Sequence, residues 1–187
     1  MKRTLGSAIA VSALIAGMSS AYAAETVVVI TSFPNSMTDP IEAAFEAANP
    51  GFDLEILNKK TSAGVKYIQE IADDNSADIF WASAPDAFEV LKSDGLLANV
   101  EVEAEGIPDM IGTYPMNDPD GFYRGFAAAG YGIMWNERYL AGNDLEPATE
   151  WDDLKNPEYH GHVGMSAPSR SGTTHLTVET LLQGEGW

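Results

Sequence analysis

The 187-residue sequence contains no cysteine. This excludes disulfides, thiolate zinc sites, a cysteine nucleophile and a lipid-bearing cysteine within it. Basic residues are also scarce, with 10 Lys+Arg against 28 Asp+Glu and a formal net charge of −18. A nucleic-acid-binding protein needs clustered cations to meet the phosphate backbone, so the charge balance argues against that class. Since 45% of the residues are hydrophobic, the sequence indicates a globular protein with an ordinary packed core.

Long hydrophobic runs are absent except at the N-terminus. Lys2 and Arg3 precede an uncharged stretch, 4–24, with an apolar centre at 8–16 and the small-x-small sequence Ala21-Tyr22-Ala23. The alternative is a membrane anchor, but the apolar centre is short for a spanning helix, which needs roughly 20 apolar residues. The pattern predicts a cleavable signal peptide at 1–23 and a soluble periplasmic product without a lipid anchor.

Strand and helix patterns alternate in the first half of the remaining chain. Runs of β-branched and aromatic residues predict strands at 26–31, 52–57 and 77–82. Apolar residues at helical spacing predict helices between and after them, at about 38–48, 64–73 and 85–93. Strand–helix alternation of this kind predicts an α/β fold with a parallel sheet.

The second half is less regular. Residues 99–120 are predicted to be mostly loop, and 122–128 and 131–135 resemble strands. A short helix is expected at 151–154, a strand at 161–166, a loop at 167–174 and a helix at 175–183. Because this last strand–loop–helix unit has no partner strand in view, we expect the chain to be a fragment of a longer protein.

Short polar loops follow the predicted strands. They are Ser32–Asn35, Thr61–Gly64, Ala82–Pro85 and Ser169–Thr174, and each precedes a predicted helix. In open α/β sheets, ligands bind beyond the carboxyl ends of the strands, where exposed N–H groups and hydroxyls form an anion site. The alternative for each loop is simple N-capping, which uses the same residue types. Four such loops together favour a ligand-binding cleft.

Residues 168–175 are the most informative of these segments. Serine, threonine and histidine, whose side chains form hydrogen bonds, occupy five of the eight positions, and Gly172 allows the backbone to approach a ligand closely. Arg170 is a candidate clamp for a phosphate or carboxylate, or else a solvent-facing loop cation. The spacing of a phosphate-binding Walker loop is absent.

Three other constellations have weaker support. His160 and His162 could share one face of a strand and bind a metal, but a third ligand is missing, and a turn leading into a strand is favoured. Ser171 and His175 could form a nucleophile–base pair, but no acidic partner can be placed and no nucleophile elbow is present. The aromatic residues near strand ends either line a cleft or pack in the core: Phe33, Trp81, Tyr131 and Trp135.

Several segments together resemble the periplasmic solute-binding proteins of ABC importers. The resemblance is to the group that contains iron(III)-binding, hexose-phosphate-binding and phosphoglycerate-transport proteins. The matching segments are 28–33, 77–86, 130–136, 151–157 and 168–187. The last segment is the most specific of them and is most similar to the phosphoglycerate-transport branch.

The resemblance implies a type II periplasmic-binding-protein fold, with two lobes built on mixed, mostly parallel sheets and a ligand between them. Residues 24–130 would form the N-terminal lobe, and 131–187 would form the hinge crossing and the start of an incomplete second lobe. Members bind without covalent chemistry, so no enzyme activity, cofactor or resident metal is expected. The expected ligand-binding residues are Ser32, Thr61, Ser62, Ser83, Ser169, Arg170, Ser171, Gly172, Thr173 and Thr174.

The expected function is capture of a small anionic solute, a phosphorylated compound or a phosphonate, by a monomer that delivers it to an inner-membrane ABC permease. One alternative is an iron(III) carrier, whose binding tyrosines in that branch would lie beyond Trp187. Another is a sensor component whose loaded form signals to a membrane kinase. A periplasmic hydrolase that uses Ser171 and His175 is the alternative from a different class.

Overall fold

The computed structural model describes residues 24–74, 76–100, 102 and 105–185. The predicted signal peptide at 1–23 lies outside these residues. Within them, no helix has both the length and the apolar character needed to cross a membrane.

A three-stranded parallel sheet forms the centre of the first half. Its strands are β1 (Glu25–Thr31), β2 (Phe52–Asn58) and β3 (Ile79–Trp81), in the order β2-β1-β3. Val29 of the central strand pairs with Ile56 on one side and Ile79 on the other. The parallel α/β sheet predicted from the sequence is therefore confirmed.

Three helices follow these strands, one after each: α1 (Asn35–Ala48), α2 (Thr61–Glu70) and α3 (Pro85–Ser93). The ends of α3 match the prediction, because proline at its first position and acidic Asp86 in its first turn favour a helix start there. Helices α1 and α2 both begin three residues before their predicted starts at 38 and 64. The predicted turn Thr61–Gly64 is thus the first turn of α2.

The buried core lies between the sheet and its helices. Ile30 of β1 and Leu91 of α3 are fully buried, and the small residues Ala82 and Ala84 of the β3–α3 connection are buried as well. Gly64 in α2 allows close packing, because a Cβ there would lie 3.0 Å from the Phe80 ring.

The segment after the hairpin of β4 (Met110–Ile111) and β5 (Tyr114–Pro115) is anchored on α3. Asp118 is 2% exposed, and its carboxylate accepts a hydrogen bond from Lys92 at 2.7 Å and another from the Phe122 N–H at 2.9 Å. Tyr123 donates to Glu89 on the same helix. These contacts fix the chain where it leaves the sheet.

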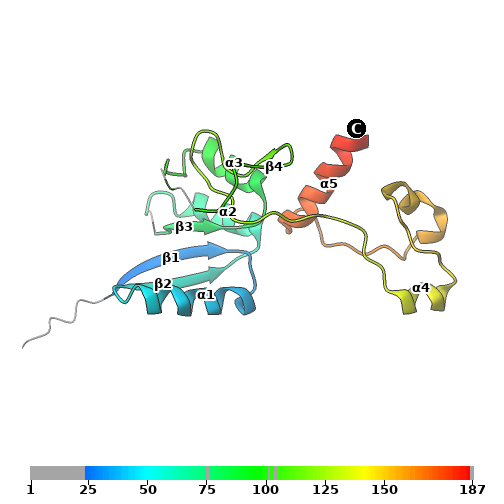
Figure 1. Ribbon diagram of the computed structural model, residues 1–187, viewed down its shortest axis with the longest axis horizontal. Helices are drawn as coiled ribbons and strands as arrows, with labels where there is room; N and C mark the ends of the chain where they lie inside the picture. Colours follow the sequence, from blue (N-terminus) through cyan, green and yellow to red (C-terminus); the bar gives the residue numbers. More distant parts are fainter. Residues whose placement is uncertain (1–23, 75, 101, 103–104, 186–187) are drawn as a thin grey trace, which may run out of the picture.

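Beyond residue 126 the chain runs away from the sheet and returns. It carries α4 (Glu137–Asn143) and the 3-10 helices η1 (Trp151–Lys155) and η2 (Pro157–Tyr159), and ends in α5 (Gly172–Glu185). Figure 1 shows α4 standing apart from the sheet, joined to it by two extended stretches of chain, with α5 between the two parts.

The strands predicted at 122–128, 131–135 and 161–166 are wrong. Among the described residues of these stretches there is one isolated bridge, between Asn117 and Arg124, and no strand. A strand needs a neighbour for its backbone groups, and these apolar runs have none within the described chain. Helix α4 was not predicted; Asn136 starts it by accepting hydrogen bonds from the N–H groups of Arg138 and Tyr139.

Candidate ligand-binding site

The carboxyl ends of all three parallel strands lie at one edge of the sheet. There, β1 ends at Thr31, β2 at Asn58 and β3 at Trp81. The Lys59 N–H donates to the Thr31 carbonyl at 2.8 Å, and the Asn58 amide donates to the Phe33 carbonyl. The loops at this edge are therefore tied together, and the helices that follow them begin close to it.

The helices at this edge lack side-chain caps. Pro34, Lys60 and Ala84 precede α1, α2 and α3, and none of them accepts a hydrogen bond from its helix through a side chain. The N-capping alternative for these loops is therefore wrong for the three helices. Their first-turn N–H groups lie at the positive end of the helix dipole and can donate hydrogen bonds to an anionic group.

The N-terminus of α5 meets the same edge. A Cβ built on Gly172 would lie 2.7 Å from the Ala84 Cβ and 3.1 Å from the Thr61 hydroxyl oxygen. Glycine is thus what permits the close approach of α5 to α2 and to the β3–α3 loop. The Ser171 hydroxyl accepts a hydrogen bond from the Thr174 N–H at 3.3 Å and so caps this helix.

The structure brings part of the predicted residue set together. Thr61, which is 6% exposed, and Thr174, which is 8% exposed, belong to the first turns of α2 and α5. Ser32, Ser62 and Ser171 are half-buried, and Gly172 is buried between the two helices. The other predicted residues are exposed: Ser83, Ser169, Arg170 and Thr173. Within the described chain, the Arg170 side chain has no ion-pair partner, so its role as a clamp stays a prediction.

Asp86 and His175 belong to the same edge and were missed as site residues. His175 Nδ1 lies 2.6 Å from Asp86 Oδ2, joining the first turns of α3 and α5. The other carboxylate oxygen, Asp86 Oδ1, is buried without a hydrogen-bond partner among the described residues. The two positions are 89 residues apart in the sequence, and no local pattern predicts that they pair.

Tyr131 lies in the electrostatic field of this pair. Burial raises the pKa of its phenol above the ordinary value, and the Asp86 carboxylate raises it further. The chain at Tyr131 therefore passes close to the first turn of α3.

The geometry of His175 does not support a hydrolase. Its Nδ1 faces Asp86, and its Nε2 lies 3.7 Å from Glu179 Oε1. The Ser171 hydroxyl is used as a helix cap and makes no hydrogen bond to the imidazole. A nucleophile must be within hydrogen-bond reach of its base, and these two side chains are not so arranged.

Aromatic side chains gather beside the edge. Phe33, Trp81 and Phe126 form a three-ring cluster, with the Phe33 and Trp81 centroids 5.1 Å apart and Phe126 within 6.2 Å of each. Phe126 is 49% exposed, so the cluster is open to solvent on one side. Trp135 is instead exposed on the distant part of the chain.

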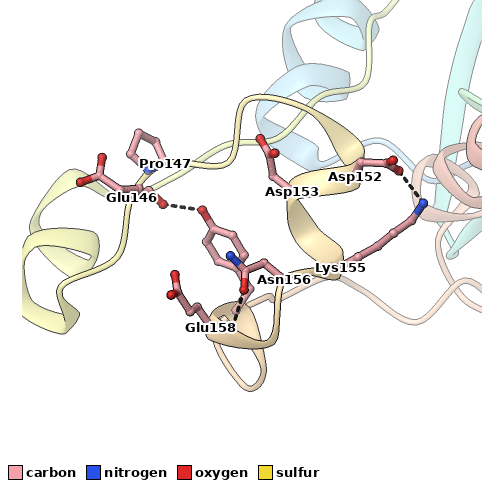
Figure 2. A pocket seen from close by; sticks show the side chains of 8 residues that line it. Glu146, Pro147, Asp152, Asp153, Lys155, Asn156 and Glu158 are labelled. Carbon is pink, nitrogen blue, oxygen red and sulfur yellow. Dashed lines mark hydrogen bonds and ion pairs between the residues drawn. The ribbon is translucent and has the colours of Figure 1, made fainter.

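One cavity lies away from this edge, among η1, η2 and the loop before them. Figure 2 shows it, and its volume is about 580 Å³. Four carboxylates line it (Glu146, Asp152, Asp153 and Glu158), and Lys155 is held against Asp152 at 2.5 Å. The N–H groups of Glu150 and Thr149 keep the pKa of Asp153 below its ordinary value. A site so rich in ionised carboxylates repels anions.

The second cavity, of about 300 Å³, is lined by Trp135 and Trp151 among others. Near it in sequence, the predicted histidine pair does not form a metal site: His162 Nδ1 lies 2.9 Å from the Tyr139 hydroxyl. No group of three or more metal-ligating side chains occurs among the residues that the structure describes.

The fold and the edge site together define a class of protein. An α/β unit with helix N-termini gathered at the carboxyl ends of parallel strands, met by a helix from a second segment, is the arrangement of a two-part solute-binding protein. Residues 74–187 match the family of bacterial extracellular solute-binding proteins. The chain belongs to that family.

Solved structures support the fold. The chain matches the periplasmic binding protein AfuA from Actinobacillus pleuropneumoniae, solved with fructose-6-phosphate bound, with a TM-score of 0.70 and 21% identity over 87% of this chain and 51% of the other. It matches the periplasmic binding protein P5PA with a TM-score of 0.68 and 18% identity, also over 87% and 51%. The predicted periplasmic-binding-protein fold is thus confirmed.

Two curated relatives match most of this chain. The chain is 30% identical over 175 residues to the phosphoglycerate transport regulatory protein PgtC of Salmonella typhimurium and to that of Salmonella typhi. The match covers 91% of this chain and 42% of each relative. The chain therefore spans less than half the length of the curated relatives that it matches.

Proposed function

We propose that this protein is the solute-capturing component of an ABC importer and that it binds a small anionic solute, either a phosphorylated organic molecule or a phosphonate. The observation that carries this proposal is the gathering of uncapped helix N-termini at the carboxyl edge of the sheet, where α5 meets α2. An anion at this edge would receive backbone N–H groups from more than one helix.

The net charge of −18 makes a local anion site necessary. Because the protein as a whole is negatively charged, it does not attract an anionic solute at long range. Its affinity for such a solute must come from hydrogen-bond donors that lie next to the solute. The Thr61 hydroxyl faces Gly172 and makes no hydrogen bond among the described residues, which leaves it available to a ligand. The first-turn N–H groups of α2 and α3 supply the remaining donors.

The similar proteins favour the phosphate-ester class. One is named for phosphoglycerate transport, and another was solved with fructose-6-phosphate bound. Both compounds carry a phosphate group on a small hydroxylated skeleton. The iron(III) alternative has no comparable support, since neither of these names mentions iron.

The remaining parts of the proposal concern organisation and location. Residues 24–130 form the N-terminal lobe, and 131–187 the hinge crossing and the start of a second lobe. After cleavage behind Ala23 the protein acts in the periplasm as a monomer and delivers its ligand to an inner-membrane permease. Membership of an extracellular solute-binding family supports the location.

A thermal-shift panel on the full chain tests the proposed ligand class. It contains 3-phosphoglycerate, fructose-6-phosphate, a phosphonate, inorganic phosphate and iron(III). A ligand that binds only the folded state raises the melting temperature by mass action. We expect a rise with a phosphate ester or the phosphonate, and a smaller rise in a Thr61→Val variant. Thr113→Val, at an exposed position in the hairpin, is the matched control. A rise with iron(III) alone would overturn the proposal.

A sensing role is the second candidate, because the curated relatives carry the word regulatory in their names. In this case the loaded protein would stimulate a membrane sensor kinase. Adding the loaded protein to vesicles that contain the permease, or to vesicles that contain the kinase, separates the two roles. Transport predicts stimulated ATP hydrolysis by the permease, and sensing predicts stimulated kinase autophosphorylation.

A further inference from the structure

The contact between Asp86 and His175 holds α5 on the N-terminal lobe. Among the described residues it is the one hydrogen bond or ion pair between α5 and the residues before 131. The other close approach of α5 is the packing of Gly172 against Ala84 and Thr61. The approach of α5 to the candidate site therefore depends on its first turn.

Asp86 depends on His175 for hydrogen bonding. Its Oδ2 faces the imidazole at 2.6 Å, while its Oδ1 is buried without a partner. Removing the imidazole would leave a largely buried carboxylate with no side-chain donor, which costs more than the loss of an exposed hydrogen bond. The pair is therefore a strong determinant of where α5 sits.

Two carboxylates face the imidazole, and a tyrosine lies near one of them. Asp86 faces Nδ1 from α3, and Glu179 lies 3.7 Å from Nε2 on α5 itself. Tyr131, from the crossing segment, lies in the field of Asp86. Histidine changes charge between about pH 5 and 8. A protonated ring is attracted to carboxylates on both sides, whereas a neutral ring keeps at most the single hydrogen bond to Asp86.

We propose that the Asp86–His175 pair is a positioning pair: it sets the N-terminus of α5 against α2 and α3, and protonation of His175 strengthens this contact and with it ligand binding. The part that concerns ligand binding rests on the proposed function. The part that concerns the position of α5 does not rest on the proposed function. An experiment can therefore contradict one part of the proposal without the other.

Hydrogen exchange on the ligand-free full chain tests the positioning of α5. We expect the protection factors of amides 175–180 to be higher at pH 5.5 than at pH 8, with amides 38–48 of α1 unchanged. His175→Ala should lower protection in α5 about tenfold. His175→Asn should restore part of it and remove the pH dependence, because the Asn amide can replace the Nδ1 donor but does not titrate.

His162→Asn is the control, since that histidine pairs with Tyr139 far from the site. It should behave as the wild type does. Equal protection of α5 in the wild type and His175→Ala would overturn the proposal. An unchanged pH dependence in His175→Asn would overturn it equally.

Calorimetric titration with 3-phosphoglycerate and fructose-6-phosphate supplies the ligand readout. Because the phosphate group itself titrates near pH 6, the quantity compared is the ratio of wild-type to His175→Asn affinity at each pH. We expect this ratio to be severalfold larger at pH 5.5 than at pH 8. A ratio that does not change with pH contradicts the link to binding. If the wild type binds neither these esters nor the phosphonate of the panel, the proposed function fails, and the exchange result alone tests the role of the pair.

Discussion

The part of the chain built on the three-stranded sheet (24–126, here called the lobe) and the segment after residue 126 differ in how their apolar residues are used. In the lobe, Ile30 and Leu91 are fully buried between a sheet and its helices. In the later segment, Met134 is 95% exposed and Met165 is 61% exposed, and of the described hydrophobic residues there Ala148 is the one that is buried. Similar hydrophobic patterns thus give a core in one region and open chain in the other, because strands and helices need partners to bury their apolar faces.

The largest effect that this comparison predicts is on stability. Leu91→Ala should lower the free energy of unfolding by about 2–5 kcal/mol, since it opens a cavity in the lobe's core. Met134→Ala, the matched change in the later segment, should alter it by less than about 0.5 kcal/mol. Urea unfolding followed by circular dichroism measures both. A comparable loss in the two variants would show that the later segment is packed as the lobe is.

A smaller effect is expected where the two regions meet. Gly172→Ala would place a methyl group 2.7 Å from the Ala84 Cβ and push α5 from the lobe. Overpacking of this kind costs about 1–3 kcal/mol, so ligand affinity should fall about tenfold or more. Gly184→Ala, in the same helix with nothing within 4 Å, is the control for helix propensity. Calorimetric titration with the ligand of the panel that raises the melting temperature most measures the affinity of both variants. Equal affinities would show that the packing of Gly172 against Ala84 does not matter for ligand binding.

The smallest predicted effect is on the way in which the stability of the lobe changes with pH. Burial works to raise the pKa of Asp118, but hydrogen bonds from Lys92 and from backbone N–H groups outweigh it and hold the pKa below its ordinary value. A depressed carboxyl pKa stabilises the folded state above the unfolded pKa of about 4, and this stability is lost as the pH falls through the folded pKa.

Lys92→Met should therefore reduce the loss of stability on acidification below about pH 4, relative to the wild type. Urea unfolding between pH 2.5 and 7 measures it. Lys155→Met is the comparison in the later segment, where the ion pair with Asp152 is exposed and should matter little. Identical acid profiles for the wild type and Lys92→Met would refute the assigned role of this ion pair.

The sequence predicts the lobe well and the later segment poorly, for one physical reason. Strands such as 26–31 and 52–57 find partners nearby in sequence, so their local pattern agrees with their environment. The apolar runs at 131–135 and 161–166 have the same kind of pattern but no partner within the described chain. The local sequence pattern indicates the tendency of a segment to form a strand. Whether a strand forms depends on a neighbouring strand with which it can pair.

The candidate site shows a similar division. Thr61 could be placed at a strand-to-helix junction because the topology of a parallel sheet fixes which ends meet. The strand predicted before Gly172 is absent, so its place at the edge follows from the packing of α5 and not from sheet topology. The absence of side-chain caps on α1, α2 and α3 could not be predicted from the sequence. Serine and threonine near a helix start are equally consistent with capping the helix and with binding a ligand. The contact of Asp86 with His175 depends on where α5 packs against the lobe. No local pattern in the sequence predicts that position.

The most direct test of the central claim is an amide chemical-shift map of the full chain, titrated with the ligand of the panel that raises the melting temperature most. The account predicts that the largest changes fall on the first turns of α2, α3 and α5, at 61–63, 86–87 and 172–174. Changes concentrated instead around the acidic cavity at 146–159, with these helix N-termini unaffected, would contradict it.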